Sequence, residues 1–66
     1  MPISVRFNKI MVYAREEAER LHNSEVLPEH LLLGILRLEE GSAYTMLVKA
    51  GCIPAEAKEM IDVHYN

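Results

Sequence analysis

Tryptophan is absent from this chain, phenylalanine occurs once, and Cys52 is the sole cysteine. A lone cysteine excludes an intrachain disulfide, and the shortage of aromatic rings leaves a core of aliphatic side chains and methionine. No apolar run approaches the roughly 20 residues of a membrane-spanning helix. No basic segment precedes an apolar one as in a secretory signal peptide. The sequence therefore indicates a small cytoplasmic domain without a membrane partner.

Positive charge is also scarce, because seven lysines and arginines face ten acidic residues, for a net charge of −3. These cations are spread along the chain, whereas a nucleic-acid binder needs a clustered basic face. A helix-turn-helix would use residues 42–50 as its reading helix, yet Lys49 is the single cation there. The sequence has neither a glycine-rich phosphate loop nor metal-ligand spacing such as H-E-x-x-H. We expect no nucleic-acid partner, no metal and no cofactor.

Apolar side chains recur at steps of three and four in several segments, which is the period of an amphipathic helix. The expected helices cover about residues 4–22, 28–39, 42–50 and 54–64. Pro28 and Pro54 suit first turns, and Gly51 suits a helix end. Met46 is expected on the apolar face of the third helix, and Met60 is expected to point inward from the fourth. Because the connections are short, the predicted fold is an all-α, compact four-helix array.

The segment 28–36, PEHLLLGIL, places a proline and an acid ahead of an almost unbroken apolar run. A helix that is apolar around most of its circumference is buried on several sides. Gly34 costs about 1 kcal/mol relative to alanine inside a helix, so we expect a neighbouring helix to approach closely there. Any activity is expected at the polar start of this helix.

The polar residues offer two candidates for catalysis or metal binding, the Glu29–His30 pair and Cys52. Glu29 and His30 form a carboxylate–imidazole pair, but adjacent helical side chains point about 100° apart and do not converge on one ion. Cys52 lacks a nearby base, so the chain is expected to be non-catalytic. The other acids, including Glu16 and Glu17, are interpreted as solvated, with Glu16 spaced to pair with Arg20.

Ser4 is the expected N-cap of the first helix, and Glu29 lies in the first turn of the second. If these helices are neighbours, the two residues lie side by side. A hydroxyl at a helix N-terminus suits a phosphate, and a carboxylate suits a guanidinium. The alternative is two ordinary helix ends, which spacing alone favours.

Residues 6–51 resemble one repeat of the Clp N-terminal domain of ClpA- and ClpC-type AAA+ unfoldases. The matching pieces are residues 14–21 (AREEAERL), 28–36 (PEHLLLGIL), 41–43 (GSA) and the Leu47 to Gly51 end of the third helix. The family domain holds two such repeats related by pseudo-twofold symmetry, so residues 1–66 are expected to be a single repeat and one half of that double domain. The resemblance implies a non-catalytic module of a bacterial chaperone and protease system, which docks adaptor proteins and protein substrates.

ClpC-type domains recognise phosphoarginine, and the resemblance places Ser4 and Glu29 on the Thr and Glu that carry that site. Pro28 stands where the family's T-E-H motif has its threonine. The chain is expected either to belong to an ATP-dependent unfoldase, whose remainder is then a partner, or to be a free-standing adaptor or regulator that binds the unfoldase in trans. A single repeat exposes the surface that its twin covers, so we expect two copies to pair as a twofold homodimer.

Overall fold

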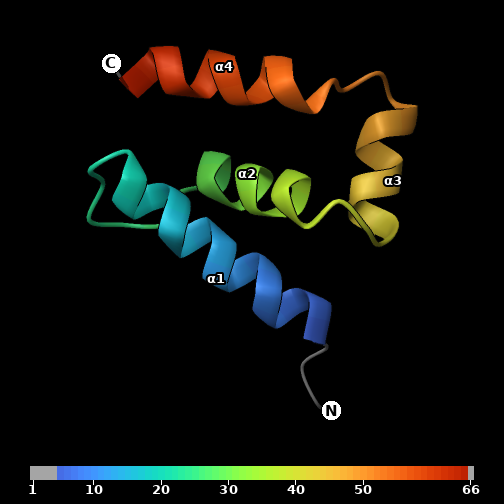
Figure 1. Cartoon of the computed structure of the whole chain (residues 1–66), viewed down its shortest axis with the longest axis horizontal. Helices are drawn as coiled ribbons and strands as arrows, with labels where there is room; N and C mark the ends of the chain where they lie inside the picture. The colour runs from blue at the N-terminus through green and yellow to red at the C-terminus, as the bar shows by residue number, and fades with distance from the viewer. Residues whose placement is uncertain (1–4, 66) are drawn as a thin grey trace.

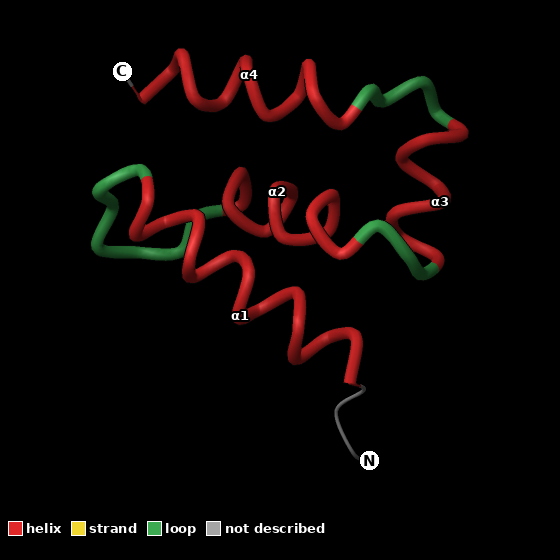
Figure 2. Tube along the Cα trace, in the orientation of Figure 1, coloured by secondary structure: helices red, strands yellow, loops and turns green. Residues whose placement is uncertain are grey.

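The computed structural model describes residues 5–65 as four α-helices and their connections. The helices are α1 (Val5–Arg20), α2 (Pro28–Leu38), α3 (Ser42–Lys49) and α4 (Pro54–Tyr65). In Figure 1, α2 lies between α1 and α4, and the short α3 joins α2 to α4 at one end. Figure 2 shows helices and loops without a strand over residues 5–65. The predicted all-α, four-helix fold is confirmed.

The core is the interface between α1 and α2. Ala14 and Ala18 of α1 and Leu33 and Leu36 of α2 are all buried. The small alanines allow the two backbones to approach, and a Cβ built on Gly34 would lie 2.7 Å from the carbonyl oxygen of Ile10. The close approach expected at this glycine is therefore confirmed, and α1 is the helix that makes it.

Two helices end in the same hydrogen-bonded motif. At the end of α1 the amides of His22 and Asn23 donate to the carbonyls of Glu19 and Ala18, with His22 in the left-handed region at φ 61°. Gly51, at φ 98°, holds the equivalent position after α3, where the amide of Cys52 donates to the carbonyl of Leu47, two residues before the helix end. These are Schellman motifs, which satisfy the terminal carbonyls and turn the chain.

The last two helices are only lightly packed. Met60 of α4 is 73% exposed, so the inward orientation expected for it is wrong. Met46 does lie on the expected apolar face of α3, but it is 70% exposed because that face borders an open groove. Neither helix holds a buried residue, since the buried apolar side chains of residues 5–65 all belong to α1 and α2. Leu31, Leu32 and Ile35 of α2 are correspondingly only half-buried, although the apolar run predicted deeper burial. Among residues 5–65, no helix has the length and apolar character needed to cross a bilayer.

Candidate functional site

Glu29 stands in the first turn of α2, half-buried at the surface of the molecule. Its carboxylate Oε2 accepts a hydrogen bond from the hydroxyl of Tyr65, which lies in the last turn of α4. The antiparallel course of α2 and α4 brings these two helix ends together (Figure 1). The carboxylate thus already receives a donor from another element, as it would from a ligand.

His30 lies next to Glu29 and is fully buried. Its Nδ1 accepts a hydrogen bond of 2.8 Å from the amide of Leu27, one of the donors that a helix start leaves unpaired. Because Nδ1 accepts, the neutral ring carries its proton on Nε2, and that buried N–H has no acceptor within residues 5–65. The ring of Tyr65 stacks against this imidazole with centroids 5.7 Å apart. His30 therefore fixes the start of α2 and supports Tyr65.

The Glu29–Tyr65 contact shifts the pKa of both groups. The hydrogen bond from the phenol favours the ionised carboxylate and holds the pKa of Glu29 below its usual value. The same bond favours the protonated phenol and raises the pKa of Tyr65. At neutral pH the pair is a carboxylate anion that accepts from a neutral hydroxyl.

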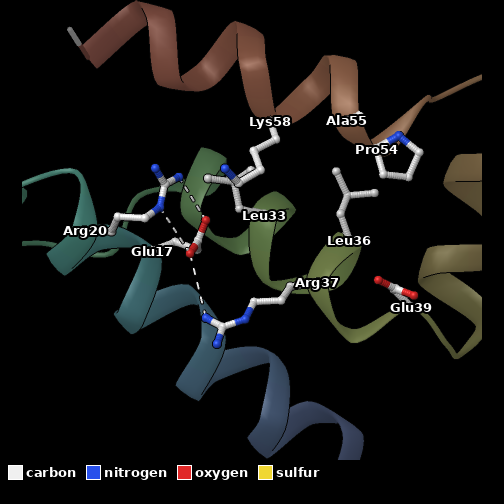
Figure 3. Close-up of a pocket in the computed structure, with 9 residues that line it drawn as sticks. All are labelled: Glu17, Arg20, Leu33, Leu36, Arg37, Glu39, Pro54, Ala55 and Lys58. Carbon is white, nitrogen blue, oxygen red and sulfur yellow. Dashed lines mark hydrogen bonds and ion pairs between the residues drawn. The ribbon is translucent and has the colours of Figure 1, made fainter.

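A second polar cluster lines a cleft of about 380 Å³ between α1, α2 and α4 (Figure 3). Glu17 lies at its centre with a side chain only 9% exposed, and it pairs with Arg20 at 3.0 Å and with Arg37 at 3.7 Å. The interpretation of Glu17 as a solvated acid is wrong, because α2 covers this face of α1. Glu16 does remain exposed, but it pairs with Arg37 at 2.7 Å instead of Arg20.

Arg20 connects this cluster to α4. Its Nη2 also donates to Asp62 at 2.6 Å, and Lys58 approaches the other oxygen of Asp62 at 3.2 Å. The guanidinium is the main reason why the pKa of Asp62 lies below its usual value. Since α4 has no buried side chain, this ion pair and the Tyr65 hydrogen bond are two of the contacts that hold it against α1 and α2.

These contacts predict a pH dependence of stability. Glu29 and Asp62 have lowered pKa values in the folded protein, so their contacts stabilise it above the ordinary carboxyl pKa and are lost as pH falls through the lowered values. The pKa of Tyr65 is raised, so its contact stabilises the folded protein below the ordinary phenol pKa and is lost as pH rises through the raised value. We expect the free energy of unfolding to fall below about pH 4 and above about pH 10.

Urea denaturation followed by circular dichroism across this pH range measures the effect. The double variant Glu29→Gln, Asp62→Asn should be less stable at neutral pH and should lose less stability on acidification than the wild type. An equal acid slope for both proteins would show that these carboxylates do not hold α4.

The structure places one of the two predicted ligand-binding residues. Glu29 occupies the expected start of α2, whereas Ser4 lies outside the described residues. The described start of α1 is not beside Glu29, because the two helices run antiparallel and Arg6 approaches Glu40, after the end of α2, at 3.8 Å. Tyr65 and Glu17 were missed by the sequence reasoning. The helical period gave no signal for the Tyr65 contact, since its partner is 36 residues away. Over residues 5–65, no group of three His, Cys, Asp or Glu side chains is arranged to hold a metal ion.

Comparison with known proteins identifies the family. Residues 2–66 match the Clp repeat (R) N-terminal domain family. The ATP-binding subunit ClpC of the ATP-dependent Clp protease of Staphylococcus epidermidis is 41% identical over 46 residues, which cover 70% of this chain and 6% of that protein. The chloroplastic chaperone protein ClpC of Pisum sativum is 33% identical over 61 residues, covering 92% of this chain and 7% of that protein.

The chain thus spans less than a tenth of the length of these relatives. None of the solved structures matches it. The family match nevertheless covers almost every residue, and the relatives align with it over two thirds of its length or more. This chain belongs to the Clp repeat N-terminal domain family.

Proposed function

We propose that residues 1–66 form a single Clp-N repeat that docks adaptor proteins and protein substrates for a Clp-type AAA+ unfoldase, without catalysing a reaction itself. Family membership and the ClpC relatives support this role. The remainder of an ATP-dependent unfoldase is then a further partner. A bacterial, cytoplasmic setting is part of the proposal. The Staphylococcus relative supports a bacterial origin, whereas the Pisum relative is chloroplastic.

The proposed ligand is phosphoarginine on marked proteins, and the Glu29 carboxylate carries this part of the proposal. It is half-buried in the first turn of α2, it accepts a hydrogen bond from Tyr65, and it is ionised at neutral pH, with a pKa below the ordinary carboxyl value. An ionised carboxylate binds a guanidinium through charge-assisted hydrogen bonds. Ser4 would supply a hydroxyl for the phosphoryl group, as the family resemblance implies.

Replacement of Glu29 by alanine tests this role. We expect Glu29→Ala to weaken binding of free phosphoarginine by about 10- to 100-fold, because a hydrogen bond to a charged group is lost. Isothermal titration calorimetry measures the affinity, and circular dichroism checks that the helices remain. Glu25→Ala is the matched control, since Glu25 is an exposed acid in the loop before α2. Equal affinity of Glu29→Ala and the wild type would remove Glu29 from the site.

The alternative function is a free-standing adaptor or regulator that binds an unfoldase in trans. The same docking surface would then act from a separate polypeptide. The coding sequence after Asn66 distinguishes the two: a downstream Walker A motif favours the unfoldase subunit, and a stop codon favours the free-standing protein.

We also propose that two copies pair when no second repeat is attached. An open apolar groove of about 500 Å³ runs between α2 and α3, lined by Pro28, Leu31, Leu32, Ile35, Ala43, Met46, Leu47 and Ala50. A twofold interface places the same patch of both copies in contact, and this groove offers such a patch. We expect sedimentation equilibrium to give twice the chain mass at high concentration. A folded monomer under those conditions would contradict the pairing.

A further inference from the structure

We propose that Tyr65 is a gate over the ligand-binding carboxylate of this domain: its hydroxyl occupies Glu29 in the free protein, and a guanidinium-bearing ligand must displace it. The inference rests on the proposed function, because it concerns the same carboxylate. It adds a residue of α4 to the carboxylate at the start of α2.

The geometry places Tyr65 as an internal competitor. Its hydroxyl donates to Oε2 of Glu29, and its ring stacks on the imidazole of His30 at an interplanar angle of 24°. The ring of His64 also contacts that of Tyr65, with centroids 5.0 Å apart and the two rings nearly perpendicular. The phenol thus holds the position of a donor to Glu29 and is oriented by two histidine rings.

The chemistry favours exchange of one donor for another. A phenol offers one neutral O–H, whereas a guanidinium offers paired N–H groups and a positive charge, which a carboxylate binds more strongly. The ligand can therefore displace Tyr65, but its apparent affinity falls by the fraction of molecules in which Glu29 is free. A ligand must therefore bind Glu29 more strongly than the phenol does, which favours a guanidinium over neutral donors.

The packing of α4 allows Tyr65 to leave. This helix holds no buried residue, and Met60 and Val63 of its last turns are 73% and 64% exposed. Opening the last turn therefore uncovers little apolar surface, which is the property of a segment that opens locally. The Arg20–Asp62 ion pair lies one turn earlier and can keep the rest of α4 in place.

In the described part of the chain, His30 holds an unsatisfied polar atom beneath the ring of Tyr65. Its buried Nε2–H has no acceptor within residues 5–65, and Tyr65 stacks on the ring that carries it. A buried donor without an acceptor is unfavourable. The ring of Tyr65 covers a face of this imidazole, and phenylalanine at position 65 would keep that cover while removing the hydroxyl from Glu29.

The test compares Tyr65→Phe with the wild type by isothermal titration calorimetry, with free phosphoarginine as the probe. Phenylalanine keeps the ring stack and removes the hydroxyl, so we expect about tenfold tighter binding. Tyr44→Phe is the matched control, because it removes a hydroxyl from half-buried Tyr44 of α3 and should leave the affinity unchanged. Circular dichroism verifies that each variant is folded.

The outcomes separate the gate from the function on which it rests. Tighter binding by Tyr65→Phe than by wild type, including binding by the variant alone, supports the gate. Equal affinity of these two proteins, with binding lost in Glu29→Ala, overturns the gate and leaves the proposed function standing. Absence of binding to both Tyr65→Phe and the wild type overturns phosphoarginine recognition and the gate with it.

Discussion

Gly34→Ala is expected to destabilise the protein by about 1–3 kcal/mol, although alanine is the better helix former by about 1 kcal/mol. The added Cβ would lie 2.7 Å from the carbonyl oxygen of Ile10 and 3.1 Å from the amide nitrogen of Ala14. Both atoms are backbone, so no side-chain rotation relieves the overlap and α1 must move away from α2. Gly34→Leu should be worse, because its larger side chain enters the same contact.

Urea denaturation monitored by far-ultraviolet circular dichroism measures this loss. Thr45→Ala serves as the control, since it raises helix propensity at an exposed position of α3. It should leave stability unchanged or slightly higher. A Gly34→Ala variant as stable as the wild type would show that α1 and α2 can separate without cost at this point.

The second large effect is expected at Arg20. Arg20→Met removes the guanidinium from the Glu17 carboxylate, whose side chain is only 9% exposed, and also from Asp62. Glu17 then keeps Arg37 at 3.7 Å, beyond ordinary hydrogen-bond distance. Because a buried carboxylate without a close partner is costly, we expect a loss of about 1–3 kcal/mol and a detached α4.

The reciprocal change should be milder. Glu17→Met replaces the buried carboxylate with an apolar side chain of similar length, while Arg20 retains Asp62 at 2.6 Å and Arg37 retains Glu16 at 2.7 Å. We therefore expect stability within about 1 kcal/mol of the wild type. Lys58→Met controls for loss of an exposed partner of Asp62, with an expected change of about 0.5 kcal/mol or less. Equal losses in Arg20→Met and Glu17→Met would contradict this asymmetry.

The Gly34 and Arg20 variants test two different parts of the domain. Gly34 belongs to the α1–α2 core, so its substitution should lower the stability of the whole chain. Arg20 belongs to the link between that core and α4, so its substitution should also weaken the position of Tyr65 over Glu29. Stability of α4 and access to the carboxylate are expected to be coupled for this reason.

The sequence by itself determined the helices and the close approach of another helix at Gly34. Prolines at helix starts, glycine after α3 and apolar steps of three and four are local signals, and they require only neighbouring residues to act. Gly34 within an apolar run also predicted a close helix contact, because its helix penalty needs a compensating interaction. Glu29 could be placed at the start of α2 by the same local reasoning.

Only the tertiary structure decided what Glu29, Glu17 and the methionines contact. Arg20 meets Asp62 across 42 residues, and Tyr65 meets Glu29 across 36. Such pairs depend on the angle and register at which α4 crosses the core, which helical periodicity does not specify. Periodicity identifies an apolar face, but the number of neighbouring helices decides whether that face is covered. Glu17 became buried and Met60 became exposed because α2 covers α1, whereas no described element covers the outer face of α4.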